Sequence, residues 1–221
     1  LKLIIMKKSS LLFLIVFSIK SLYAVDNDII LEEKFPKKLS DFHFFKDTHA
    51  QIPSKGVVPY ELISSLFSDY SYKQRWVYIP EGKKASFRKD KVFDFPVGSA
   101  LIKTFYYPVD ERDLSIGKKL LETRLLLRKT NGWEAVSYAW NESQNEAIIK
   151  KAGKTIITDW IDFKGESRSV RYRVPNKNQC KECHSNNDAV MPIGPKARNL
   201  NKVYDYQDES INQLTKWMKL D

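Results

Sequence analysis

The stretch LLETRLLLRKTNGWEAVSYAW, residues 120–140, consists of two apolar runs that meet at Asn131-Gly132. Alternation along the first run sorts its side chains into two faces, with Leu121, Thr123, Leu125 and Leu127 on one and Glu122, Arg124 and Arg128 on the other. An Asn-Gly pair between such runs is typical of a type I′ turn, because both central residues need positive φ. We therefore predict one antiparallel hairpin over residues 120–140.

Similar short runs, rich in β-branched and aromatic residues, lie on both sides of this hairpin. The candidate strands are Trp76–Ile79, Val92–Phe95, Ala100–Tyr107, Leu120–Arg128, Trp133–Trp140, Ile156–Ile161 and Val170–Val174. Strands at this spacing predict an antiparallel β-sandwich-like module, which we place at residues 37–174. Their aromatic side chains favour core packing over ligand stacking.

The sequence changes character after Pro175. Asp208-Glu209-Ser210 precede apolar residues at helical spacing, namely Ile211, Leu214, Trp217 and Met218. This pattern predicts a short amphipathic helix with an acidic first turn. The expected fold is therefore mainly β, with a sandwich-like module followed by a short, mostly loop and helical segment, residues 175–221.

That last segment contains Cys180-Lys181-Glu182-Cys183-His184, which includes both cysteines of the chain. C-x-x-C-H is the attachment signature of c-type haem. Each thiol can form a thioether with a porphyrin vinyl group, and His184 then lies under the iron as its proximal ligand. We expect one covalent haem c bound by Cys180, Cys183 and His184, and a role in electron transfer, since haem c fixed in this way usually carries electrons.

Two other readings of the motif are less favoured. Zinc needs four ligands, and the only other histidines, His43 and His49, lie far upstream. A thioredoxin-like pair would open a helix directly after a strand of a βαβ unit, whereas residues 175–179 are loop-like.

The N-terminus predicts export. Lys2, Lys7 and Lys8 precede the apolar run Leu11–Ile19, and Ser21-Leu22-Tyr23-Ala24 follows it. This is the pattern of a signal peptide, here residues 1–24, and the run is about half the length of a membrane-spanning helix. We expect a periplasmic protein with no stable membrane anchor after cleavage. Bacterial haem c is attached outside the cytoplasmic membrane, so leader and motif support each other.

The charge of the chain bears on its partners. The leader contains four lysines and no acids, so its removal lowers the formal net charge from +10 to +6, with 33 basic and 27 acidic residues. A basic face steers a cytochrome toward a redox partner protein with an acidic face, an effect that salt weakens. Nucleic acid is not an expected partner outside the cytoplasm.

Several stretches resemble a known family. They are Gly56-Val57-Val58-Pro59-Tyr60, Leu66-Phe67-Ser68-Asp69-Tyr70, Phe95-Pro96-Val97-Gly98, Leu101-Ile102-Lys103-Thr104-Phe105, Leu121-Glu122-Thr123-Arg124 and Pro175-Asn176-Lys177-Asn178-Gln179-Cys180. From about Leu39 onward the chain resembles exported bacterial proteins, mostly uncharacterised, in which a β-rich module precedes c-type haem motifs. The resemblance implies haem attachment at Cys180, Cys183 and His184. Members tend to continue into a second C-x-x-C-H, so we expect residues 175–221 to be an incomplete cytochrome c fold.

The remaining iron contacts stay open. Met191, Met218, His43 and His49 are candidates for the sixth ligand, and none stands out. The carbonyl of Pro195 is a candidate hydrogen-bond acceptor for the proximal imidazole; the alternative is that residues 191–195 form a plain turn.

No catalytic triad is visible, so an electron carrier is a better reading than a catalyst. Two other functions remain. The first alternative is a haem-bearing subunit of a periplasmic oxidoreductase. The second is an envelope or carbohydrate-binding β module with a vestigial haem segment.

Overall fold

The structure is a computed structural model of the 221-residue chain, and it describes residues 24–186 and 189–219. The predicted signal peptide, apart from Ala24, lies outside the described residues. None of the helices in the described ranges is both long and apolar enough to cross a membrane.

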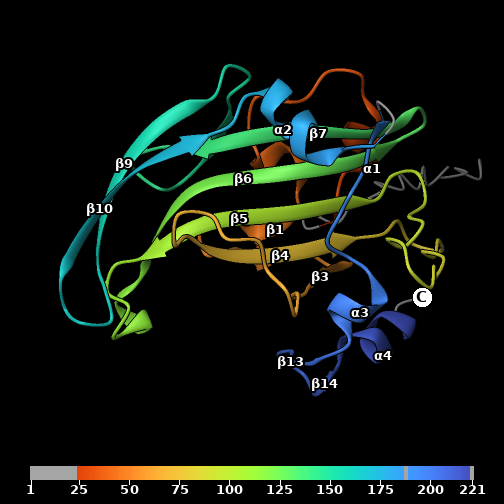
Figure 1. Cartoon of the computed structure of the whole chain (residues 1–221). Coiled ribbons are helices and arrows are strands. Elements are labelled where there is room, and N and C mark those ends of the chain that lie inside the picture. Colours follow the sequence, from red (N-terminus) through yellow and green to blue (C-terminus); the bar gives the residue numbers. More distant parts are fainter. Residues whose placement is uncertain (1–23, 187–188, 220–221) are drawn as a thin grey trace, which may run out of the picture.

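A six-stranded antiparallel sheet forms the centre of the molecule (Figure 1). Its strands follow chain order: β3 (Val57–Pro59), β4 (Tyr72–Tyr78), β5 (Ala100–Pro108), β6 (Lys118–Lys129), β7 (Gly132–Trp140) and β8 (Ala147–Ile149). The six-stranded sheet and the further antiparallel pairs make the described part of the chain mainly β, so the predicted mainly-β, sandwich-like fold is confirmed.

The predicted hairpin is β6–β7, but its turn differs from the prediction. Lys129 pairs with Gly132, so the loop residues are Thr130 and Asn131. Neither loop residue has positive φ, whereas Gly132, the first residue of β7, has φ of 130°. The hairpin prediction is therefore confirmed, and the type I′ assignment is wrong.

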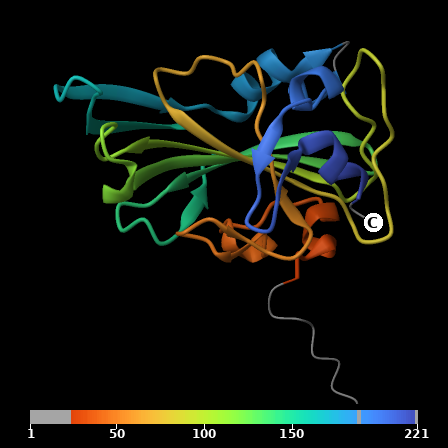
Figure 2. The same ribbon diagram turned by 90° about the horizontal axis from the view of Figure 1, so that it is seen from below.

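The first face of the sheet, face A, is covered by the N-terminal segment. This segment contains α1 (Asn27–Leu31), the 3-10 helix η1 (Ser40–Phe42), β1 (Phe45–Asp47) and β2 (Ile52–Pro53). Its Ile30 and Phe42 are fully buried in one cluster with Ile102, Leu125 and Tyr138 of the sheet. Figure 2 shows these red and orange helices on one side of the sheet and the blue helix α2 (Lys177–His184) on the other.

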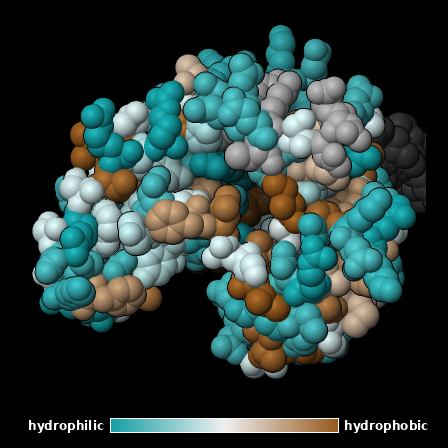
Figure 3. Space-filling view, viewed as in Figure 1, coloured by the Kyte–Doolittle hydropathy of each residue, from teal (hydrophilic) through white to brown (hydrophobic). Residues whose placement is uncertain are grey.

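The second face, face B, is covered at its two ends and, over β7, by helix α2. At one end the antiparallel ribbon of β9 (Lys154–Ile161) and β10 (Ser167–Val174) packs Trp160 and Tyr172 against Phe105. At the other end Leu200 and Trp217 pack beside Leu101. These come from the C-terminal elements α3 (Ala197–Leu200), β13 (Val203–Asp205), β14 (Ser210–Asn212) and α4 (Gln213–Met218). Figure 3 shows this surface hollowed between the two ends.

One predicted strand does not form, and the predicted C-terminal helix is present but begins later than expected, without its acidic first turn. Residues 92–95 make only isolated bridges, Val92 with Lys196 and Asp94 with Ser86, and form no strand. The C-terminal helix begins after Asn212, whose side chain accepts a hydrogen bond from Leu214 N at 2.9 Å. Asp208 and Glu209 precede the helix and instead form ion pairs with Lys216.

Candidate functional site

The predicted site residues all lie in helix α2 (Lys177–His184), directly after β10. A capping box starts the helix, because the Asn176 side chain accepts from Gln179 N and the Gln179 side chain accepts from Asn176 N, both at 3.0 Å. Cys180 and Cys183 are three residues apart, so the backbone places them side by side on one face of the helix. Their side chains lie outside the described part of the chain.

His184 ends the helix and is held by the chain that returns past it. β11 (Ser185–Asn186) pairs with β12 (Ala189–Val190), and Met191 N then donates to the His184 carbonyl at 2.7 Å. His184 Nδ1 lies 3.0 Å from the Met191 carbonyl oxygen. A carbonyl can only accept, so Nδ1 carries the proton and Nε2 keeps its lone pair.

The predicted hydrogen bond from the His184 imidazole to the Pro195 carbonyl is therefore wrong. The carbonyl of Pro195 does not contact His184, since it accepts from Phe93 N at 3.2 Å. Met191 takes the role that the sequence suggested for Pro195. The β11–β12 hairpin brings Met191 back to the helix, and this turn could not be read from the sequence.

The pKa of His184 is lowered, chiefly by burial and further by the positive charges of Lys103 and Arg124, while the hydrogen bond to Met191 opposes the shift. Burial disfavours the charged imidazolium. The side chain is therefore neutral near pH 7, which is the form that binds a metal.

Helix α2 packs against β7 on face B, next to a group of charged side chains. Arg75 on β4 pairs in register with Lys103 on β5, and Lys103 pairs with Arg124 on β6. We call these three residues the cationic row. Alternation places it on face B, since Val77, two residues after Arg75, belongs to the cluster that includes Leu101.

The neighbouring row contains one acid and an aromatic ring. Lys73, Phe105 and Glu122 are paired across β4, β5 and β6. Arg124 Nε donates to Glu122 Oε1 at 2.9 Å, and the guanidinium carbon of Arg124 lies 4.3 Å from the centre of the Phe105 ring. Glu122 lies on the polar face of the alternating pattern, yet it is fully buried, because the β9–β10 ribbon covers it and Tyr172 donates to it.

The candidate sixth ligands do not gather near His184. Met191 stays on the side of the imidazole that it hydrogen-bonds, and Met218 is 76% exposed on α4. His43 and His49 are exposed and belong to the N-terminal segment on face A. The two distant histidines therefore cannot share a metal with His184, for iron or for zinc.

The local fold also differs from that of a thioredoxin-like site. Cys180 is the fourth residue of α2 rather than a residue at its start, and the strand before the helix, β10, pairs antiparallel with β9. Among the described residues no group of three or more His, Cys, Asp and Glu could hold a metal ion.

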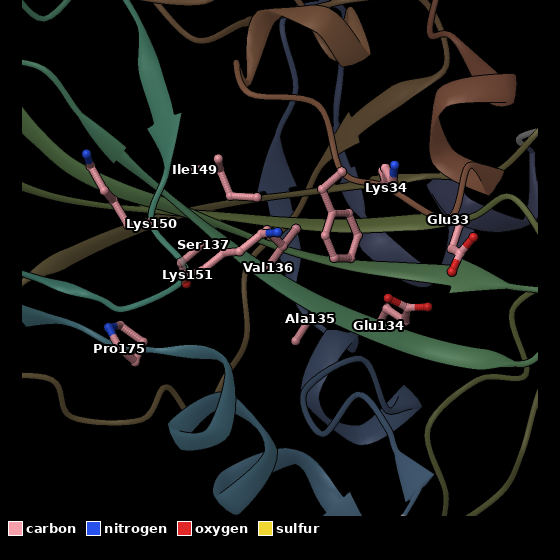
Figure 4. Close-up of a pocket in the computed structure, with 11 residues that line it drawn as sticks. Glu33, Lys34, Glu134, Ala135, Val136, Ser137, Ile149, Lys150, Lys151 and Pro175 are labelled. Atoms are coloured by element: carbon pink, nitrogen blue, oxygen red, sulfur yellow. The ribbon is translucent and has the colours of Figure 1, made fainter.

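Described residues outside α2 line two cavities. A cleft of about 190 Å³ lies between the segment after α1, strands β7 and β8, and Pro175 (Figure 4). An apolar groove of about 510 Å³ lies beside β3 and β4, with Phe87, Phe93 and Trp217 among its lining residues. Only the groove reaches the roughly 300–1,000 Å³ of typical small-molecule sites.

Comparison of the chain with protein-family models, with curated proteins and with solved structures found no match. The assignment of the site therefore depends on the motif and on the geometry of α2 and face B.

Proposed function

We propose that this protein is a periplasmic c-type cytochrome that carries one covalent haem and takes part in electron transfer. The observation that carries the proposal is the hydrogen bond from His184 Nδ1 to the Met191 carbonyl, next to a C-x-x-C pair on the same helix. A metal-ligating histidine commonly donates its other ring nitrogen in this way, which fixes both its tautomer and its orientation.

The described residues fit a haem held at α2. Cys180 and Cys183 would supply two thioethers from one helix face, and His184 Nε2 would bind the iron. The porphyrin would have the cations Lys103 and Arg124 on the same, hollowed face of the sheet (Figure 3). When bound, the haem supplies a site for reversible one-electron oxidation and reduction.

The surroundings of α2 favour exchange of electrons with another protein. Asn178, Gln179 and Glu182 are exposed along the helix, so a haem attached here would lie close to solvent. The basic excess of the chain favours a partner with an acidic face. Exchange with such a partner should slow as salt screens the charges.

The test is a set of absorbance spectra of protein made with a haem-attachment system. The wild type should keep its haem through denaturation and acid extraction, and its pyridine haemochrome should indicate two thioether bonds. The double variant Cys180→Ala/Cys183→Ala should release any haem into the acid extract. Wild-type protein that also releases its haem would overturn the proposal.

A histidine pair provides the matched control. His184→Ala should change the ferric and ferrous spectra, because the proximal ligand is lost. His49→Ala, on face A, should leave both spectra as they are. Equal spectra for His184→Ala and the wild type would reject His184 as the proximal ligand.

A second candidate function is ligand binding by the β portion, and the apolar groove favours it. Trp217 and Phe93 line the groove with ring centres 5.9 Å apart, and aromatic side chains of this kind stack on sugars. Trp217 fluorescence during titration with envelope oligosaccharides tests this function. A saturable change in haem-free protein supports it, and an unchanged signal rejects it.

A further inference from the structure

The cationic row places three like charges directly opposite one another on adjacent strands. Arg75 faces Lys103, and Lys103 faces Arg124, in the register of β4, β5 and β6. Like charges in this position destabilise a sheet. Such a row in the middle of a sheet face therefore calls for negative charge to balance it.

The protein itself provides little of that charge. Glu122 is paired with Arg124 and also accepts a hydrogen bond from Tyr172. Glu61, the acid that acts on Arg75, accepts a hydrogen bond from Lys202 at 2.7 Å. Glu122 acts on Lys103 through its charge, but neither acid forms a hydrogen bond with Lys103.

Two members of the row have no polar partner of their own within the described ranges. Arg75 is only 8% exposed, yet its guanidinium makes no hydrogen bond or ion pair with a described residue. The ammonium of Lys103 likewise has no such bond there and lies 4.8 Å from the centre of the Phe105 ring. Neither group is among the fully enclosed polar atoms that lack a partner, so both reach the surface of face B, where an anion can approach them.

The electrostatics of the row agree with this reading. Burial, and then the charges of Arg124 and Arg75, lower the pKa of Lys103 to about 7. Burial also lowers the pKa of Arg75. An anion that enters this desolvated region would interact strongly with both cations.

The position of the row identifies the anion. Helix α2, which ends at His184, packs against β7, and β7 pairs with β6, the strand that carries Arg124. Lys103 and Arg124 also act electrostatically on His184. A haem attached to α2 brings two propionate carboxylates on one edge of the porphyrin. Carboxylates are the groups that arginine binds best, with two parallel hydrogen bonds.

We propose that Arg75, Lys103 and Arg124 bind the haem propionates and set the charge balance around the iron. This inference rests on the proposed function and adds a specific binding site for the haem propionates on face B. Each cation also stabilises the iron in its reduced, less positive form, so the row raises the reduction potential.

The experiment compares Arg75→Gln with Arg88→Gln in the full-length haem protein. Arg88 is the matched control because its side chain is 57% exposed and pairs with Asp94 on the surface. Resonance Raman spectra report the propionate bending mode, which responds to hydrogen bonds on the carboxylates, and redox titration gives the potential. Arg75→Gln should shift the band and lower the potential, and Arg88→Gln should change neither.

Lys103→Gln is the second variant. The propionate band and the reduction potential can be measured on it even if Arg75→Gln loses its haem. Bands and potentials equal to the wild type in a variant that retains haem would overturn this inference alone. A wild-type potential that moves with added phosphate at an unchanged propionate band would assign the row to a free anion, and also overturn it. Wild-type protein without covalent haem would overturn both proposals.

Discussion

At the scale of single residues, Glu122 holds together the charges on face B. Its carboxylate accepts hydrogen bonds from Arg124 and Tyr172, and the residue has no exposed surface. Glu122→Ala should lower the free energy of unfolding by about 3 kcal/mol, because it leaves Arg124 and the Tyr172 hydroxyl without their acceptor. Urea denaturation measures this loss.

The control for Glu122 is Glu166. Its side chain is 59% exposed and pairs with Arg168 at 2.7 Å. Glu166→Ala should cost less than about 1 kcal/mol, as is usual for surface ion pairs. Equal losses in the two variants would show that Glu122 is not a buried partner.

Lys103 gives the haem-free protein a characteristic dependence on pH. The pKa of Lys103 is about 7 in the folded chain, against 10.5 for the free side chain. Between these values the unfolded chain binds more protons, so the free energy of unfolding contributed by Lys103 rises with pH. Denaturation of haem-free protein should show a steeper rise from pH 7 to about pH 9.5 in the wild type than in Lys103→Met. Parallel curves would contradict the lowered pKa.

At the scale of elements, the turn before β9 fixes where α2 begins. Gly153 has φ of 76°, and a Cβ there would lie 2.5 Å from the Val174 carbonyl and 3.2 Å from Asn176 N. Gly153→Ala would therefore push against the end of β10 and the cap of α2. Gly82, with φ of 73° and nothing within 4 Å of a Cβ, is the matched control.

Both alanine substitutions meet the strain of positive φ, of about 1–2 kcal/mol, but only one meets the backbone of a neighbour. Thermal and urea unfolding should show that Gly153→Ala costs at least about 1 kcal/mol more than Gly82→Ala. A smaller difference in unfolding free energy between the two variants would mean that the β10–α2 junction can shift to accommodate a Cβ at position 153.

The strands show what a sequence pattern can and cannot predict. Alternation located β4, β5, β6, β7, β9 and β10, because each has a side-chain period of two. It misplaced Leu121, which packs with Phe105 on face B, because the β5–β6 register shifts between Phe105 and Tyr106. A bulge of this kind moves side chains between faces and leaves no mark in local alternation.

At the scale of the whole molecule, Gln213 joins the C-terminal segment to the sheet module. Its side chain is fully buried, accepts from Glu61 N at 2.7 Å, and donates to the carbonyls of Glu61 and Leu200 at 3.0 and 3.2 Å. Gln213→Ala leaves backbone groups of both segments unpaired. It should cost about 2 kcal/mol and expose the C-terminal segment to limited proteolysis.

Gln207, exposed in the same segment, is the control. Gln207→Ala should stay within about 0.5 kcal/mol of the wild type, with unchanged proteolysis. Similar cleavage patterns for Gln213→Ala and the wild type would show that other contacts hold the segment.

The candidate site is only partly visible in the sequence. Cys180, Cys183 and His184 lie within five consecutive residues, so a local motif reveals them. Arg75, Lys103 and Arg124 come from three separate strands, and only the register of the sheet brings them together. Local alternation places Arg124 on a polar strand face, but no local pattern relates it to Arg75 or Lys103. Met191 reaches His184 through the β11–β12 hairpin, which is a consequence of tertiary folding.

The central claim is that Cys180 and Cys183 attach one haem. Its most direct test is the intact mass of the denatured protein after expression with a haem-attachment system. The account predicts the polypeptide mass plus that of one haem, and the bare polypeptide mass for Cys180→Ala/Cys183→Ala. Wild-type protein at the bare polypeptide mass, under conditions where a control cytochrome c acquires its haem, would contradict the account.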